Sequence, residues 1–163
     1  MLVKMLDAPG AKAYALQLRA LLLDAVAHGA SVGFVMPLAE EDAADYWRGA
    51  MAAIDAGSRI LLGAWQDHVL VGTVQLDLCM KANGGNRAEV QKLLVHSGAR
   101  RGGIGTALMA AAEAQALALG RGLLFLDTEA GSAAEALYAR LGYTRVGELP
   151  EYCATPGGAW RAT

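Results

Sequence analysis

Residues 88–105 read AEVQKLLVHSGARRGGIG and combine a strand pattern, a glycine-rich turn and a helix pattern. The first part of this stretch, residues 88–95, is short and largely apolar, which is typical of a β-strand. The alanine-rich run over residues 104–119, ended by Gly120, predicts a helix. The glycine-rich segment 100–105 therefore joins a strand to a helix start, where unpaired backbone N–H groups and the helix dipole attract anions.

The segment 100–105 has the residue types that a pyrophosphate site needs. Glycines let the backbone approach a phosphate closely, and two arginines add permanently charged, forked donors. The alternative is a glycine-rich turn with solvated arginines, because short glycine motifs are weak evidence on their own. The patterns GxGxxG and GxxxxGK[ST] are both absent, which favours CoA over NAD or ATP. The predicted cofactor-binding residues here are Arg100, Arg101, Gly102, Gly103, Ile104, Gly105 and Thr106.

Strand patterns also precede this stretch. Residues 60–65 and 69–79 flank a turn at residues 66–68, and polar residues alternate with apolar ones in the second run. A further reversal at residues 83–86 leads into residues 88–95. The pattern predicts three consecutive antiparallel strands.

Two helices are predicted before these strands. Leucines spaced along one face predict a helix over residues 10–27. An acidic start at residues 40–42 and an apolar middle predict a second helix that ends at Gly57. The glycine-punctuated segment 29–34 between them is predicted to be a loop, and such loops often face ligands.

The C-terminal part alternates strands and a helix. Residues 123–126 predict a short apolar strand, residues 133–141 a last helix ended by Gly142, and residues 143–146 a further strand. The tail from Pro150 carries no readable pattern.

Composition bounds the class of protein. A chain of 163 residues with 55% hydrophobic content predicts one domain over residues 1–163 with room for a ligand cleft. The net charge of −2 argues against a nucleic-acid partner, and no apolar run reaches the roughly 20 residues needed to cross a membrane. No export signal is visible at the N-terminus, so a cytoplasmic location is expected. Cys79 and Cys153 are expected to be reduced and structural, and no metal site is predicted.

The sequence resembles the GNAT superfamily of acyltransferases. Arg100-x-x-Gly103-x-Gly105 matches the signature loop of that family, and residues 136–143 resemble its closing helix. A narrower resemblance, to the branch with tabtoxin-resistance acetyltransferases, rests on residues 29–34, 46–47, 89–96 and 126–128. The resemblance implies an α+β fold in three layers. Its mixed, mainly antiparallel sheet is split near the strand 88–95 and has helices on both faces.

The resemblance also implies direct transfer of an acetyl group from acetyl-CoA to an amine. Backbone N–H groups near Leu94 and Val95 would receive the acetyl carbonyl. Glu89 and Asp127 are candidates for holding or deprotonating the acceptor ammonium; the alternatives are a solvent-facing strand residue and a loop or helix-cap carboxylate. Tyr138 is the candidate that protonates the departing thiolate, and its alternative is a core tyrosine.

The expected acceptor site combines the loop at residues 28–36 with the second helix. Ser31, Phe34, Tyr46 and Trp47 are its candidates, although an aromatic pair on a helix is also typical of a core. Two features depart from the family pattern. Ser132 stands where relatives carry a cofactor-contacting asparagine, and no hydrophobic strand follows to pair with residues 143–146, so the sheet edge is either incomplete or completed by another chain, as in a homodimer.

The predicted function is acetylation of a small-molecule amine, with toxin or antibiotic resistance as one biological setting. The alternatives are a protein or peptide N-acetyltransferase, which needs an open groove, and an inactive CoA-binding protein.

Overall fold

The computed structural model describes residues 1–163 and contains a five-stranded sheet in the order β1-β2-β3-β4-β5. The strands β1 to β4 pair antiparallel with their neighbours, whereas β4 and β5 are parallel. A second sheet pairs β6 with β7 near the C-terminus. The strands are β1 Leu2–Leu6, β2 Arg59–Gln66, β3 Val69–Leu78, β4 Arg87–Val95, β5 Leu123–Phe125, β6 Cys153–Ala154 and β7 Trp160–Arg161.

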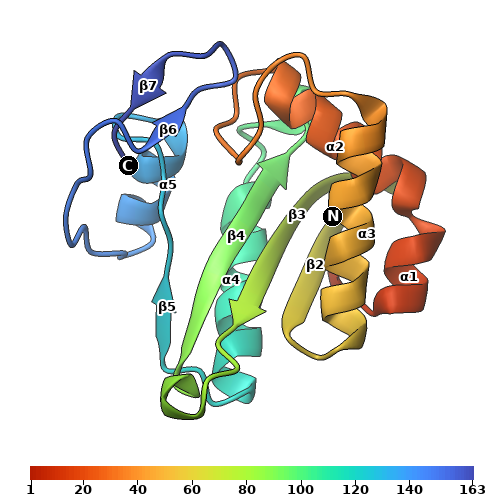
Figure 1. The fold of residues 1–163 in the computed structure, drawn as a ribbon. Coiled ribbons are helices and arrows are strands. Elements are labelled where there is room, and N and C mark those ends of the chain that lie inside the picture. Colours follow the sequence, from red (N-terminus) through yellow and green to blue (C-terminus); the bar gives the residue numbers. More distant parts are fainter.

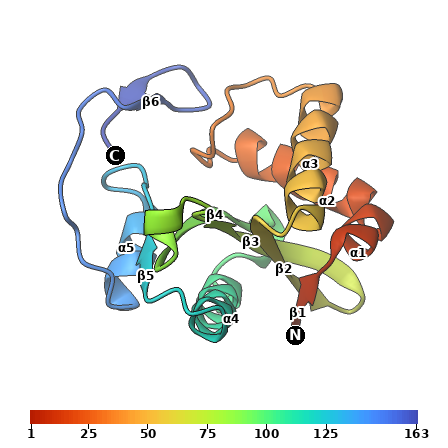
Figure 2. The same cartoon turned by 60° about the horizontal axis from the view of Figure 1, so that its bottom comes forward.

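Helices cover both faces of the large sheet. Figure 2 shows α1, α2 and α3 on one side of the sheet and α4 on the other, with α5 beside β5. The helices are α1 Ala8–Ala13, α2 Ala15–Ala27, α3 Glu40–Asp55, α4 Ile104–Ala118 and α5 Ala133–Arg140, with the short 3-10 turns η1 Ala82–Gly84 and η2 Ser97–Ala99. No helix is both long enough and apolar enough to span a membrane. The mixed sheet and two helix layers confirm the predicted fold class.

A bulge in β4 sends its side chains into both cores. Val90 packs in the core beneath α4, whereas Leu94 packs in the core beneath α2 and α3. Four residues apart, these side chains would share one face of a regular strand. The pairing with β3 shifts between Thr73 and Gln75, and opposite that shift Lys92 has the left-handed φ of 48°. The extra residue of the bulge reverses the faces, as expected from a period of two.

β4 extends beyond the segment that pairs with its parallel neighbour, β5. Pairing with β5 covers only residues 87–89 of β4, opposite Leu123–Phe125, while β4 continues to Val95. In Figure 1, β5 runs beside the lower part of β4 and the chain then diverges toward α5. Residues 90–95 consequently have no strand partner on that edge, which confirms the predicted split near residues 88–95.

Two predicted elements were wrong, and one strand was missed. The helix over residues 10–27 is divided at Tyr14, which ends α1 and packs edge-on against Trp65 with ring centroids 5.2 Å apart. β1 was not predicted, because its mostly exposed residues show no clear alternation and only pairing with β2 defines it.

The predicted strand at residues 143–146 is also absent. Val146 is fully exposed, so the apolar character there buries nothing. The tail instead folds back on itself through reciprocal backbone hydrogen bonds between Leu149 and Thr163.

Candidate active site

The start of α4 is an anion-binding geometry. Gly103 occupies the N-cap position with a left-handed φ of 78°, and no side chain caps the helix. The first helical hydrogen bond runs from the Ala107 N–H to the Gly103 carbonyl, so the N–H groups before Ala107 remain free of helical partners. Arg101 is left-handed as well, with a φ of 65°. Successive N–H groups in such a turn converge on an anion.

The two arginines of this loop point their charges to solvent. Both are exposed and neither forms a salt bridge; Arg100 is positioned by a 3.3 Å hydrogen bond from Nε to the Val95 carbonyl. Thr106 is exposed in the first turn of α4. Ile104 is 1% exposed and packs in the core, so only its backbone can meet a ligand. The loop therefore offers free cations and free N–H groups, which suit a pyrophosphate.

Gly105 serves helix packing. A Cβ at this position would lie 3.1 Å from Leu137 of α5, so the absence of a side chain lets α4 and α5 approach. Ser132 caps α5, since its hydroxyl accepts from the Glu135 N–H at 3.1 Å and lies 3.5 Å from Thr128 Oγ1. The Ser132 hydroxyl therefore stabilises the start of α5.

A row of charged residues crosses the sheet on the face covered by α3. Arg59, Asp77 and Glu89 are register neighbours on β2, β3 and β4, and Glu89 is followed by Phe125 on β5. Arg59 donates to the Asp77 carboxylate in a salt bridge. Glu89 forms no salt bridge, so its partly exposed carboxylate is available to a ligand.

Asp127 and Tyr138 lie together beyond the end of β5. Tyr138 is 9% exposed, and its ring packs against that of Tyr143 with centroids 5.7 Å apart. Burial, and then the nearby charge of Asp127, raise the pKa of Tyr138 to about 12. The phenol is consequently protonated throughout the neutral range. Asp127 itself is exposed.

Lys92 extends from the bulge into the space between the sheet and α3. Its Nζ lies 5.3 Å from the centre of the Tyr46 ring and 3.7 Å from where a Cβ on Gly33 would be. Burial, followed by the charge of Arg59, lowers the pKa of Lys92, whereas Asp127 and Glu89 act to raise it. The lysine thus links the charged row with the loop that precedes α3.

A cavity of about 670 Å³ opens beside Tyr46. Its walls are the loop before α3, the first half of α3 and β6; the lining residues are Gly33, Phe34, Val35, Pro37, Leu38, Asp42, Asp45, Tyr46, Cys153 and Ala154. Six of these ten residues are hydrophobic, so the cavity suits a partly apolar ligand. The tail closes one side, because the Met36 N–H donates to the Pro156 carbonyl at 2.8 Å.

Two of the four predicted acceptor residues line the cavity, and two do not. Phe34 and Tyr46 line the cavity and pack edge-on, with ring centroids 5.6 Å apart. Trp47 is 1% exposed and belongs to the core, so it supports Tyr46 from behind and does not meet a ligand. Ser31 lies outside the lining, with its hydroxyl 3.4 Å from the Cys153 sulfur.

Leu94 and Val95 contribute backbone only. The Leu94 side chain is 1% exposed, and that of Val95 packs against the α4-side core. The His96 N–H donates to the Val71 carbonyl on β3. Since alternate residues of a strand direct their N–H groups to opposite edges, the Val95 N–H faces the edge that β5 leaves open.

A sheet split beside β4 and an uncapped, anion-binding helix start are features that an acyltransferase of the acyl-CoA-dependent class combines. The family model described as the Acetyltransferase (GNAT) family matches residues 23–143, and the chain belongs to this family. It is an acetyl-CoA-dependent N-acetyltransferase.

Solved structures share the fold over nearly the whole chain. Ribosomal-protein-alanine N-acetyltransferase from Brucella melitensis is 22% identical, with a TM-score of 0.76 and coverage of 99% of this chain and 95% of that one. The yncA structure from Salmonella typhimurium, solved with its cofactor acetyl-CoA, is 17% identical, with a TM-score of 0.77 and coverage of 99% and 89%. Aminoglycoside 6'-acetyltransferase type Ii is 24% identical, with a TM-score of 0.70 and coverage of 100% and 96%.

Sequence reasoning missed Lys92 and Asp24. Asp24 lies in the last turn of α2 and accepts hydrogen bonds from Ser97, which precedes the cofactor loop, residues 100–105. A signal for Lys92 existed, because the alternation of residues 88–91 is lost at Lys92-Leu93, as happens at a bulge. No local signal identifies Asp24, since its partner is 73 positions away in the chain.

Proposed function

We propose that this enzyme acetylates the primary amine of a small molecule by direct attack within a ternary complex. One observation carries the proposal: the open edge of β4 at residues 90–95 leads directly into the anion-binding loop 100–105. A thioester beside the open edge and a pyrophosphate at the helix start would then belong to one extended cofactor.

The residues present fit acetyl-CoA. Free N–H groups at Gly103 to Thr106 and the side chains of Arg100 and Arg101 would hold the pyrophosphate. The Val95 N–H would donate to the acetyl carbonyl and stabilise negative charge there during attack. When bound, acetyl-CoA supplies the activated acetyl group and a thiolate leaving group.

Glu89 and Asp127 would handle the amine. An alkyl ammonium with a pKa of about 10.4 is only about 0.04% free amine at pH 7, a handicap of roughly 4.6 kcal/mol before attack. Glu89 on the sheet and Asp127 beyond β5 both lie close enough to Lys92 to influence its pKa, which supports a shared site. We assign proton removal to Glu89 and ammonium binding to Asp127.

Tyr138 would return a proton to the leaving group. Its hydroxyl, with a pKa of about 12, stays protonated at neutral pH. Proton transfer from this phenol to a thiolate whose acid has a pKa near 8.5 is uphill by a few kcal/mol. A step of this size is compatible with protonation of a thiolate that forms only transiently.

The cavity of about 670 Å³ has the size of a site for a small acceptor. The tail segment that carries Cys153 and Pro156 borders the loop before α3 and would limit the approach of a protein substrate on that side. The narrower resemblance to tabtoxin-resistance enzymes stays a prediction, as does a role in toxin or antibiotic resistance.

Two measurements test the function. Acetyl-CoA, but not NAD or ATP, should raise the melting temperature, and Arg100→Ala with Arg101→Ala should reduce that shift. Release of free CoA should then be followed across amino acids, polyamines, aminoglycosides and peptides. Absence of a shift with any CoA species would reject the cofactor site; acetylation of peptides alone would transfer the assignment to a protein N-acetyltransferase.

A further inference from the structure

We propose that Lys92 binds a carboxylate of the acceptor, so that the acceptor is an α-amino acid or a compound that carries the α-amino-acid group. The inference rests on the proposed function, because it places the acceptor in the same cleft. It adds a substrate class and a specificity-determining residue.

The Lys92 ammonium has no anionic partner in the protein. Its contact of known geometry is with the face of Tyr46, 5.3 Å from the ring centre, and it takes part in no salt bridge or side-chain hydrogen bond. The side chain is partly buried between the sheet and Gly33. An ammonium that is partly removed from water without an anion is less favourable than a solvated one, and a ligand carboxylate would offset that cost.

The neighbouring cation already has a partner. The other cation that influences Lys92, Arg59, is already engaged with Asp77. Lys92 is therefore the unpaired cation beside the row formed by Arg59, Asp77 and Glu89. Residues 29–38, which form the loop above it, contain no charged residue that could neutralise it.

Two carboxylates near Lys92 would bind the amine of the acceptor. Glu89 and Lys92 both lie on the face of β4 that α3 covers, because Ala88 and Val90 pack on the other face and Lys92 contacts Tyr46 of α3, and the charges of Glu89 and Asp127 both act on Lys92. A zwitterion complements this pattern, with its ammonium toward the carboxylates and its carboxylate toward Lys92. In an α-amino acid the two charged groups are attached to one carbon, which matches charges of opposite sign that lie close together.

The cavity accounts for the rest of the acceptor. Its apolar wall of Phe34, Val35 and Leu38 would take a side chain, and Asp42 and Asp45 lie exposed at α3 where the ligand would reach solvent. Asp45 is already paired with Arg48, so its charge is partly neutralised.

Matched ligands test the carboxylate directly. Each α-amino acid is compared with its amide and with the amine that lacks the carboxyl group, first as substrates with acetyl-CoA and then as ligands in the presence of free CoA, where no turnover occurs. The amino acids should have a KM and a Kd about 10 to 100-fold lower than their two analogues. Equal values across each set, with acetylation intact, would overturn the role of Lys92 and leave the proposed function standing.

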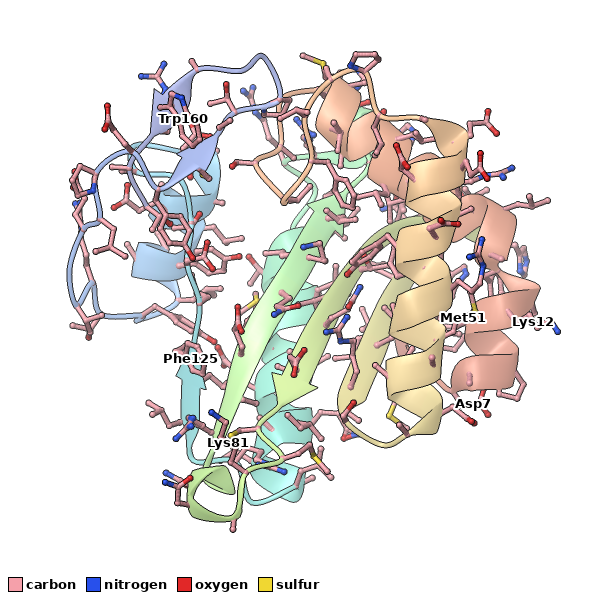
Figure 3. All side chains as sticks on the ribbon, in the orientation of Figure 1. Asp7, Lys12, Met51, Lys81, Phe125 and Trp160 are labelled. Carbon is pink, nitrogen blue, oxygen red and sulfur yellow. The ribbon has the colours of Figure 1, made fainter.

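Variants separate a binding role from a structural one. Lys92→Gln should raise KM for the amino acid about 10 to 100-fold and leave KM for its amide and for acetyl-CoA unchanged, and Lys92→Arg should restore part of the preference. Lys81→Gln is the matched control, because Lys81 is exposed in the β3–β4 connection and lies far from the tail hairpin marked by Trp160 in Figure 3.

Loss of affinity for both members of a pair in Lys92→Gln would contradict carboxylate binding and indicate a role in packing. Failure of all α-amino acids as substrates and as ligands, while another amine is acetylated, would reject the substrate class. A protein that acetylates no amine at all would reject the proposed function together with this inference, whereas the melting shift with acetyl-CoA would still report on the cofactor site.

Discussion

Asp24 and Ser97 are joined by two hydrogen bonds of 2.7 Å, one from the Ser97 N–H and one from its hydroxyl, both to the Asp24 carboxylate. The bonds connect the last turn of α2 to η2, which leads into the cofactor loop. His28 Nδ1 and His96 Nε2 lie 3.2 and 3.8 Å from the same carboxylate. Because His96 Nδ1 accepts from the Gly98 N–H, a neutral ring carries its proton on the nitrogen that faces Asp24.

Asp24→Asn should weaken cofactor binding and stability. The amide can accept only one of the two Ser97 bonds well, so we expect a loss of about 1–2 kcal/mol in the free energy of unfolding and a several-fold rise in KM for acetyl-CoA. Asp55→Asn, at the exposed end of α3, is the control and should match the wild type. An unchanged KM for acetyl-CoA, despite lower stability, would restrict Asp24 to a structural role.

The contribution of Asp24 should depend on pH in the acidic range. Partial burial acts to raise its pKa, but the bonds from Ser97 and the two histidines outweigh burial, and the pKa is lowered overall. A carboxyl with a lower pKa in the folded state stabilises fully above its unfolded value, about 3.9, and loses that contribution as pH falls through the folded value. Denaturant titrations of wild type and Asp24→Asn should therefore differ most at pH 5–7 and converge near pH 2; a constant difference would contradict the argument.

Gly103→Ala should impair cofactor binding. The φ of 78° disfavours any residue with a Cβ, by about 1 kcal/mol or more, and relaxation would turn the first N–H groups of α4 away from the pyrophosphate. Isothermal titration with CoA should show an affinity at least several-fold lower. Gly98→Ala lies in the same connection without a left-handed φ and meets nothing closer than 3.5 Å, so it should bind normally. Equal affinities for CoA in the two variants would show that the left-handed turn at Gly103 does not contribute to cofactor binding.

Tyr138→Phe should lower kcat about 10 to 1000-fold while the affinity for acetyl-CoA and the melting temperature change little. Its hydroxyl shares no hydrogen bond with the protein, so the ring packing survives the substitution. Tyr143→Phe is the matched control, because it removes the phenol hydroxyl of the neighbouring ring, which lies beside Glu113, and should leave turnover intact. A normal kcat in Tyr138→Phe would exclude the phenol from proton transfer.

Glu89→Gln should reduce activity most at low pH. The free amine is scarcest there, so removal of a base costs more than at pH 9, where an amine of pKa about 10.4 loses its proton more readily. Profiles of kcat/KM between pH 6 and 9 measure the effect, and Asp127→Asn should instead act mainly on acceptor KM. A loss for Glu89→Gln that is constant over this range would indicate that the carboxylate positions the amine without deprotonating it.

The sequence by itself determined the local elements and the anion-binding loop. Periodicity of apolar residues encodes a strand or helix directly, and Gly103 with Arg100 and Arg101 encodes a helix start that accepts an anion, because these properties depend on residues near one another in the chain. The strand predicted at residues 143–146 was wrong because a local pattern was not sufficient there. An apolar run forms a strand only if a neighbouring strand pairs with it.

Tertiary structure decided which side chains share the cleft. The bulge at Lys92 reverses the faces of β4, and the register of β3 against β4 aligns Asp77 with Glu89. Trp47 is buried while the adjacent Tyr46 meets the cavity, and Ser97 finds Asp24 on a distant helix. Register and packing depend on contacts between distant residues, and no periodicity within one segment records them.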